Sequence, residues 1–257
     1  MKVFIIGDIV GNTGVKKVRE VLPAFIKEEN IDFVIANGEN SADGMGITSQ
    51  IFNNLLNAGV NVVTMGNHTW GKKDIFNIID NPQLIRPANY SKEVPGNGYG
   101  IYECNGKTIC VINLIGRVDM NALSDNPFTV AKEIIEEVKS KADIIIIDFH
   151  AEATAEKIAM GYYLDGEVTF IFGTHTHVQT ADEKILEKGT AYITDIGMTG
   201  PKKSVIGMGV DESIKRFVTT IPERYKTSDD KEAFLNGCLL EINDETCRAE
   251  KIKRRNL

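Results

Sequence analysis

Side chains that can bind metal ions or transfer protons follow several apolar runs of this 257-residue chain. They are Asp8, Glu39, Asn40, Asn67, His68, His150, His175 and His177, and they include all four histidines. Their oxygen and nitrogen atoms suit iron, manganese or zinc. Two ions about 3.5–4 Å apart need a shared carboxylate, and the two oxygens of Glu39 make it the natural bridge. The pattern therefore predicts a two-metal site.

Each of these residues also has an explanation that needs no metal. Asp8 could cap the glycine-rich turn that follows it, and Glu39 could be a solvated loop acid. Asn67 could be a turn amide, and His150 could be a core histidine with its hydrogen bonds satisfied. A lone pair such as His175-x-His177 arises by chance. Because these explanations must all hold together, a shared metal site is the more economical interpretation.

The four cysteines do not suggest a metal site. None lies near a histidine in the sequence, so ions that prefer thiolates are disfavoured. The number of imidazoles also disfavours calcium. Cys104 and Cys110 flank an Asn-Gly turn and could face each other across a hairpin, but free thiols in a reducing cytosol are the favoured interpretation.

Alternating strands and helices position the candidate residues in the first half of the chain. We expect strands at 2–7, 32–37 and 60–65, and helices at 14–29, 49–58 and 72–79. Thr48 is the expected N-cap of the second helix and Gly59 its stop signal, while Pro23 should kink or begin the first. Groups at the carboxyl ends of strands gather at one edge of an open α/β sheet.

The second half combines helices with hairpins. We expect hairpins at 99–113 and 184–194, strands at 143–149, 167–172, 235–242 and 247–253, and helices at 128–140, 152–162 and 211–219. The glycine-punctuated segment after Asp195 is expected to be a substrate lid or irregular surface. With no linker or repeat, residues 1–257 are predicted to form a single α/β domain with two mixed sheets packed face to face and helices outside.

Composition limits the partners. The net charge of −7 weakens the case for a protein that grips long nucleic acid, which needs a basic face. Arg86, Arg117 and Lys157 could pair with a phosphate, although solvated surface charge is favoured for each, as it is for the basic C-terminal tail. No apolar run approaches the ~20 residues of a membrane span, so a cytoplasmic location is expected. A homo-oligomer is left open.

The motifs resemble those of the calcineurin-like metallophosphoesterases. They are Gly7-Asp8-x-x-Gly11, Gly66-Asn67-His68, the lone His150, and Gly173-x-His175-x-His177. Longer stretches, including GDIVGNTG, ANGENSADGMGIT and GTHTHVQTADE, are similar to the YmdB-like phosphodiesterases, from residue 7 to about 210. The chain departs from the wider superfamily at Val10, where many relatives have His, at Glu39, where many have Asp, and at Thr69, where an acid is usual.

The resemblance implies a metallophosphoesterase fold, an α-β-β-α sandwich with two metal ions. It implies one ion on Asp8, Glu39, Asn40 and His177, and the other on Glu39, Asn67, His150 and His175. It makes His68 the catalytic residue that is not a ligand, and it favours iron. The implied activity is hydrolysis of small phosphodiesters, chiefly 2′,3′- or 3′,5′-cyclic nucleotides, by a metal-bridging hydroxide.

Other functions remain open from the sequence. A phosphomonoesterase or a nuclease could use the same ligands, and a regulatory protein could bind a nucleotide there with slow turnover. A redox di-iron bundle is disfavoured, since such proteins carry Glu-x-x-His on helices. The physiological substrate, the native metal and the group that orients His68 are not determined by the sequence.

Overall fold

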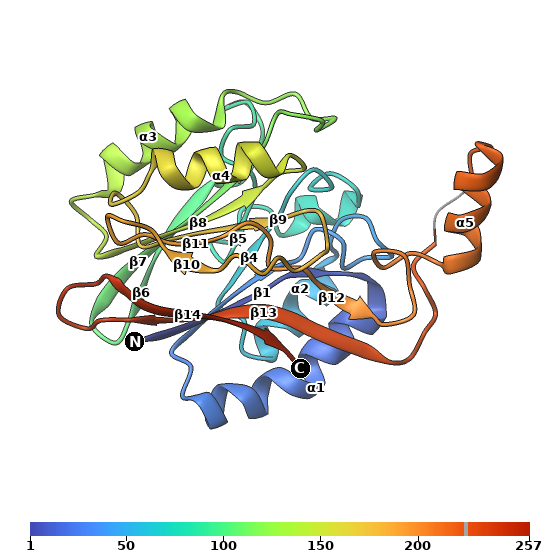
Figure 1. Ribbon diagram of the computed structural model, residues 1–257, viewed down its shortest axis with the longest axis horizontal. Coiled ribbons are helices and arrows are strands. Elements are labelled where there is room, and N and C mark those ends of the chain that lie inside the picture. Colours follow the sequence, from blue (N-terminus) through green and yellow to red (C-terminus); the bar gives the residue numbers. More distant parts are fainter. Residues whose placement is uncertain (224–225) are drawn as a thin grey trace.

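Two β-sheets pack face to face between two layers of helices in the computed structural model, which describes residues 1–223 and 226–257 (Figure 1). The first sheet contains β1 (Lys2–Ile6), β2 (Asp8–Ile9), β3 (Phe33–Asn37), β4 (Val62–Thr64), β5 (Leu84–Ile85), β12 (Met198–Pro201), β13 (Ala233–Ile242) and β14 (Ala249–Asn256). The second contains β6 (Tyr99–Cys104), β7 (Lys107–Ile115), β8 (Ile144–His150), β9 (Phe170–Thr174), β10 (Lys184–Ile185) and β11 (Ala191–Ile193).

The helices are α1 (Gly11–Glu29), α2 (Ser49–Asn57), α3 (Pro127–Val138), α4 (Thr154–Tyr163), α5 (Val210–Thr219) and the short 3₁₀ helix η1 (Lys73–Asn77). Helices α1 and α2 cover the outer face of the first sheet, and α3 and α4 cover that of the second. In Figure 1, α1 lies below the sheets, α3 and α4 lie above them, and α5 projects from one end. The predicted fold class is confirmed. None of the described helices is long and apolar enough to span a membrane.

Burial on both faces explains the continuous apolar strands. In β1, Val3 and Ile5 point into the layer between the sheets, whereas Phe4 and Ile6 point into the layer beneath α1. Successive side chains of a strand face opposite sides, so a strand covered on both faces needs no polar alternation. In the first sheet β1, β3 and β4 are parallel, and in the second β7, β8, β9 and β11 are parallel.

Several local predictions are confirmed and others need correction. The side chain of Thr48 caps α2 by accepting from the Ile51 amide, as predicted. Helix α1 begins at Gly11 because the Gly14 amide donates to the Val10 carbonyl at 3.1 Å, so Pro23 lies inside the helix. The predicted helix at 72–79 is the shorter 3₁₀ helix η1, Lys73–Asn77.

The glycine-rich segment after Asp195 is not wholly a loop. Strand β12 is buried and pairs with β2 on one side and β13 on the other. The lid-or-surface interpretation is therefore wrong for 198–201. A four-residue strand of sequence MTGP shows no periodicity, and distant partners create it.

Two of the cationic side chains expected at the surface are buried. Lys157 is 1% exposed and Arg86 6%, so neither is a solvated surface charge.

The two cysteines of the β6–β7 hairpin do not face each other. Cys110 is opposite Ile101, and Cys104 is opposite Lys107. All four cysteines are free, as favoured. The basic tail forms β14, whose arginines pair with Glu183 and Glu29.

A close backbone approach positions Asp8. The backbone at Gly7 passes so close to the backbone at Gly197 that a Cβ on Gly7 would lie 2.0 Å from the carbonyl oxygen of Gly197. The amide of Asp8 donates to that same oxygen at 3.1 Å. Only a residue without a side chain allows this contact, which explains the glycine that precedes Asp8.

A buried ion pair supports the turn that follows β9. The Lys157 ammonium of α4 lies 2.7 Å from Oδ2 of Asp195, and both side chains are almost fully buried. The same oxygen accepts from the amide and the hydroxyl of Thr176 at 3.2 and 2.7 Å. This carboxylate therefore fixes the residue between His175 and His177.

We expect Gly7→Ala to lower the free energy of unfolding by about 1–3 kcal/mol, because overpacking forces backbone shifts of this cost. Gly209→Ala is the matched control, since its added Cβ meets only the mobile carboxylate end of Glu212. Chemical denaturation measures both. Equal stability of the two variants would contradict the close-approach argument.

We expect Lys157→Met to destabilise the protein by about 3–5 kcal/mol, because it leaves the Asp195 carboxylate buried without its partner. Lys188→Met should stay within about 0.5 kcal/mol of the parent, since Lys188 is exposed. Urea unfolding followed by circular dichroism compares the two variants. If Lys157→Met were as stable as the parent, the ion pair would add no support.

Candidate metal centre

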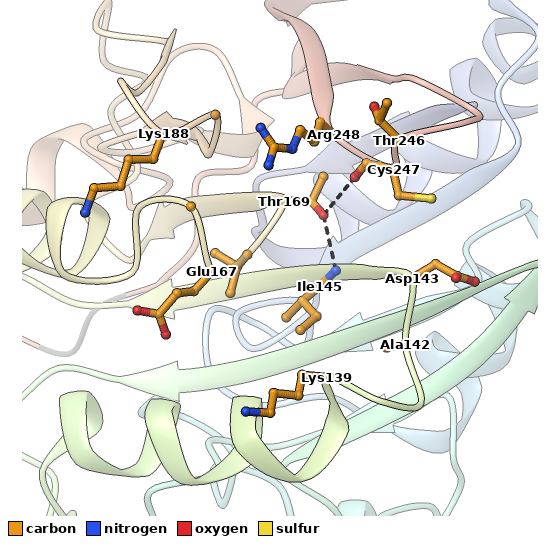
Figure 2. Close-up of a pocket in the computed structure, with 13 residues that line it drawn as sticks. Lys139, Ala142, Asp143, Ile145, Glu167, Thr169, Lys188, Thr246, Cys247 and Arg248 are labelled. Carbon is orange, nitrogen blue, oxygen red and sulfur yellow. Dashed lines mark hydrogen bonds between the residues drawn. The ribbon is translucent and has the colours of Figure 1, made fainter.

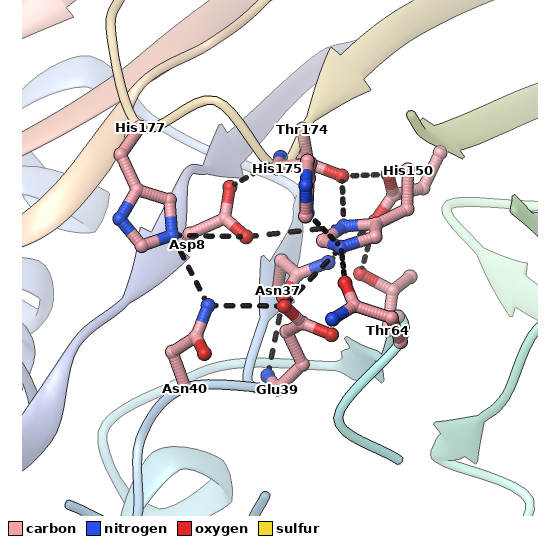
Figure 3. Close-up of polar contacts among 12 residues, drawn as sticks. Asp8, Asn37, Glu39, Asn40, Thr64, His150, Thr174, His175 and His177 are labelled. Carbon is pink, nitrogen blue, oxygen red and sulfur yellow. Dashed lines mark hydrogen bonds and ion pairs between the residues drawn. The ribbon is translucent and has the colours of Figure 1, made fainter. Parts of the chain in front are cut away.

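The predicted site residues come together at the carboxyl ends of the parallel strands. Figure 3 shows six of them, namely Asp8, Glu39, Asn40, His150, His175 and His177. Asp8 follows β1, Glu39 and Asn40 follow β3, and Asn67 and His68 follow β4. From the second sheet, His150 ends β8, and His175 and His177 follow β9. The expected convergence of both sheets on one place is present.

One group of ligand atoms surrounds Nε2 of His150. Oδ1 of Asn67 lies 2.9 Å from this nitrogen, Nδ1 of His175 lies 3.0 Å from it, and Oε1 of Glu39 lies 3.2 Å from it. The ligand atoms of Glu39, His150 and His175 lie within 4.8 Å of one another. Four potential ligands thus crowd a volume that a single cation could occupy.

A second group shares Oε1 of Glu39. The side-chain nitrogen of Asn40, Nδ2, lies 3.0 Å from that oxygen and 3.1 Å from Nε2 of His177. Oδ1 of Asp8 lies 3.9 Å from the same His177 nitrogen. The two groups contain the residues of the two implied ligand sets, with Glu39 common to both, and their binding of metal stays a prediction.

One carboxylate oxygen of Asp8 is buried without a hydrogen bond. Its Oδ2 accepts from the His175 amide at 3.1 Å, but its Oδ1 is buried and has no hydrogen-bond partner among the described residues. An unsatisfied buried carboxylate oxygen is costly and rare. Burial raises the pKa of Asp8, although His177 and His150 act in the opposite direction. A cation beside Oδ1 would remove this cost, so the residues present fit a metal.

Charges within the group shift the titration of its other members. Burial favours neutral forms, yet the charge of Glu39 raises the pKa of His150 to about 9. In turn, His150 and His68 outweigh burial at Glu39 and hold its pKa below the ordinary value. Burial and the neighbouring His150 lower the pKa of His175 to about 3. Glu39 and His150 thus each favour the charged form of the other.

The orientation of His150 depends on residues that sequence analysis missed. Its Nδ1 lies 2.8 Å from the hydroxyl of Thr174, which donates to Asp148 at 2.7 Å. Since that hydroxyl gives its hydrogen to Asp148, it accepts from Nδ1, and Nε2 is left facing the ligand group. Asp148 also accepts from Thr64 and Asn37, and burial raises its pKa to about 6. An acid inside the apolar run IIIIDFH was the available signal.

The turn that carries His175 and His177 is not extended, contrary to expectation. Their φ angles are +98° and +66°, a left-handed region that residues with a Cβ rarely adopt. The amide of His175 is held by Asp8, and Thr176 is held by Asp195. Both imidazoles reach the centre through two strained residues, and such strain is concentrated at functional sites.

His68 lies beside the two ligand groups. Its Nδ1 is 2.7 Å from Oδ1 of Asn40, and its backbone amide donates to Oε2 of Glu39 at 2.9 Å. Its side chain is one-third exposed, whereas Glu39 is buried. Asn40 is therefore the group that orients His68, a role that the sequence left undetermined.

A cavity of about 340 Å³ opens onto the centre. Its lining comprises Glu39, Asn40, His68, Glu152, His175, Thr176, His177, Val205, Ile206, Met208, Ser213 and Phe217. His68 and parts of both ligand groups thus face a space that a small molecule can enter. The volume is at the lower end of the roughly 300–1,000 Å³ typical of small-ligand pockets.

A second cavity lies at the opposite ends of the strands (Figure 2). It is lined by residues near the starts of β8 and β9, including Ile145 and Thr169, and by Lys188 and Arg248. The hydroxyl of Thr169 links Ile145 to the Cys247 carbonyl there. None of the predicted site residues lines this cavity.

Comparisons with known proteins agree with the motifs. A family model described as YmdB-like protein matches residues 4–255. A protein of Bacillus subtilis (strain 168) named 2′,3′-cyclic-nucleotide 2′-phosphodiesterase is 48% identical over 255 residues, which cover 99% of this chain and 96% of that protein.

Two solved structures share the whole fold, each with a TM-score of 0.94. A hypothetical protein from Thermus thermophilus is 37% identical, with 100% of this chain and 99% of that chain covered. A novel phosphatase from Mycoplasma pneumoniae is 39% identical, with 100% and 93% covered. The chain therefore belongs to the family of YmdB-like proteins, as its motifs predicted.

Proposed function

We propose that this protein is a phosphodiesterase that hydrolyses cyclic nucleotides with two metal ions held in the candidate centre. One observation carries the proposal: two groups of residues able to bind metal meet at a Glu39 oxygen, beside a buried Asp8 oxygen, Oδ1, that accepts no hydrogen bond in the described residues. The similar Bacillus subtilis protein is named a phosphodiesterase, which agrees with the expected class of enzyme. Iron is the metal we favour, while manganese or zinc suits the same ligand types.

The ligand assignment follows the two groups. Asp8, Glu39, Asn40 and His177 would hold one ion, and Glu39, Asn67, His150 and His175 the other. When bound, such ions lower the pKa of water and neutralise the charge that builds on a phosphoryl group. Asp148, acting through Thr174, keeps Nε2 of His150 directed at the centre.

His68 is the residue that we assign to proton transfer. It lines the cavity, and its Nδ1 is engaged by Asn40, so Nε2 is the nitrogen available to a substrate. A proton donated from Nε2 would reach the leaving ester oxygen and stabilise the departing alcohol. This role requires that the ring be held at the edge of the centre. Asn40 holds the ring itself, and the hydrogen bond from the His68 backbone amide to Glu39 holds its backbone.

Asn40 has two ways to hold this ring. Here its Oδ1 faces His68 while its Nδ2 faces Glu39 and His177. As a ligand, it would present Oδ1 to the ion by turning its amide over, which exchanges two atoms of nearly equal size. Nδ2 would then donate to Nδ1 of His68, and the ring proton would sit on Nε2. That tautomer can donate toward the substrate.

Cyclic nucleotides are the substrates that we favour. The relative's name specifies the 2′,3′-cyclic class, and the cavity is large enough for a small ligand. Cleavage of 3′,5′-cyclic nucleotides remains part of the proposal. The four free cysteines support a reducing, cytoplasmic location.

Removing metal tests the proposal directly. Freshly purified protein should contain two equivalents of metal by elemental analysis and should hydrolyse 2′,3′-cyclic AMP. Chelation should abolish the hydrolysis, because the ligand set alone provides no nucleophile, and added iron or manganese should restore it. Full activity after complete metal removal would contradict the proposal, as would less than one turnover per protein.

The same preparation separates the competing activities. Bis-p-nitrophenyl phosphate should be hydrolysed faster than p-nitrophenyl phosphate. The reverse order would favour a phosphomonoesterase.

We expect His68→Ala to lower kcat by about 10²–10⁴-fold, the usual contribution of a general acid, and to keep its metal. His150→Ala should lose both metal and turnover, since it removes a ligand at the middle of one group. Kinetics paired with elemental analysis distinguishes the two outcomes. An unchanged kcat in His68→Ala would remove His68 from the mechanism.

A further inference from the structure

The cavity above the centre has two unlike walls. One part of the lining carries the polar residues of the centre, whereas the other part consists of Val205, Ile206, Met208 and Phe217, with Ser213 from the same stretch of chain. We call these four apolar side chains the apolar wall. A ligand that fits both walls has an anionic end and an apolar end, and a phosphate alone would leave the second wall in contact with water.

The apolar wall is tied directly to the candidate centre. Nδ1 of His177 lies 2.8 Å from the carbonyl oxygen of Ile206, so one histidine links the wall to the second ligand group. Val205 and Met208 exchange two backbone hydrogen bonds of 2.9 Å, which close a tight turn over Ile206 and Gly207. The wall is therefore a built part of the site.

The turn retains a costly residue. Ile206 has a φ of +47°, although β-branched residues are poorly suited to this region and glycine or asparagine would be favoured. Its side chain is nevertheless 51% exposed, so core packing does not explain it. Backbone strain of this kind is kept where the surrounding structure uses it, commonly at ligand sites.

Helix α5 adds an aromatic ring to the wall. Ser213 and Phe217 are one helical turn apart and face the cavity together, and Phe217 is 74% exposed. The Ser213 hydroxyl already donates to the Gly209 carbonyl at 2.7 Å. The side chains of the apolar wall thus offer a ring and aliphatic surface, with no polar group of their own to read a base edge.

We propose that the apolar wall binds the nucleobase of the substrate, that Phe217 stacks on it, and that different bases are accepted with similar efficiency. This inference rests on the proposed function, because the phosphate must occupy the candidate centre for the base to reach the wall. Every base has a flat face that stacks on an aromatic ring, whereas selection among bases needs hydrogen bonds to their edges. The wall provides the first kind of contact.

The test compares a substrate with a base and one without. Phe217→Ala should reduce kcat/KM for 2′,3′-cyclic AMP by about 5- to 150-fold, the loss expected from one base–aromatic stack. It should leave kcat/KM for glycerol 1,2-cyclic phosphate unchanged. Phe217→Trp should restore cyclic AMP hydrolysis, and Val218→Ala, on the same helix but outside the cavity lining, should behave as the parent. The parent should hydrolyse the four 2′,3′-cyclic nucleotides within about tenfold of one another.

Equilibrium dialysis of adenosine 3′-monophosphate provides a readout other than turnover, and Phe217→Ala should weaken this binding by a similar factor. Equal losses on both substrates, or no loss on either, would overturn the inference. A changed sedimentation coefficient in Phe217→Ala with unchanged kinetics would also overturn it, because α5 would then contact a second copy. If the parent protein hydrolyses no cyclic nucleotide, the proposed function fails instead.

Discussion

The structure depends on how four buried carboxylates at one edge of the two sheets are compensated. Asp8, Glu39, Asp148 and Asp195 are each fully buried. Asp195 is paired with Lys157, and Glu39 lies against His150. The four acids come from both sheets, so the fold itself brings like charges together. Neutralising them is a condition for the sheets to pack at this edge.

The remaining two acids are treated differently. Asp148 accepts hydrogen bonds from Thr64, Thr174 and Asn37, and its raised pKa eases its neutralisation. Asp8 accepts one backbone hydrogen bond on Oδ2, whereas Oδ1 has no hydrogen-bond partner among the described residues and lies 3.9 Å from the nearest nitrogens of His150 and His177. Natural proteins rarely leave such an atom unsatisfied. Asp8 is thus the residue whose burial is best explained by a cation, and it lies beside the ligand atoms of two neighbouring strands.

The sequence predicted the strands and ligand residues of this site better than the buried side chains that hold them in place. Uninterrupted apolar strands ending in Asp, Glu or His could be recognised, because burial on both faces and parallel pairing leave a local pattern. Asp148, Thr174 and Lys157 could not be assigned roles, since these depend on contacts between segments far apart in the chain. The strand β12 was missed for the same reason: its four residues are a strand only because β2 and β13 lie on either side.

The H-x-H segment shows a related limit. An extended backbone would place both imidazoles on one side, yet the chain reaches this result through two residues with positive φ. Their strain is supported by Asp195 through Thr176 and by Asp8 through the His175 amide. Spacing alone predicted the convergence correctly, but the backbone that achieves it follows from tertiary contacts.

The two walls of the cavity have separate structural origins, and this separation bears on function. The polar wall is built from the ends of parallel strands, where the packing of both sheets fixes each side chain. The apolar wall belongs to the segment between β12 and β13, and helix α5 of that segment projects from the body of the molecule (Figure 1). Under the proposed function, changes in that segment would alter contacts to a substrate without moving the sheet edge. The only direct hydrogen bond between the apolar wall and the centre in the described residues joins His177 to a backbone carbonyl. A backbone carbonyl can accept this hydrogen bond whichever side chain its residue carries. The sequence of the apolar wall can therefore vary while the centre stays in place.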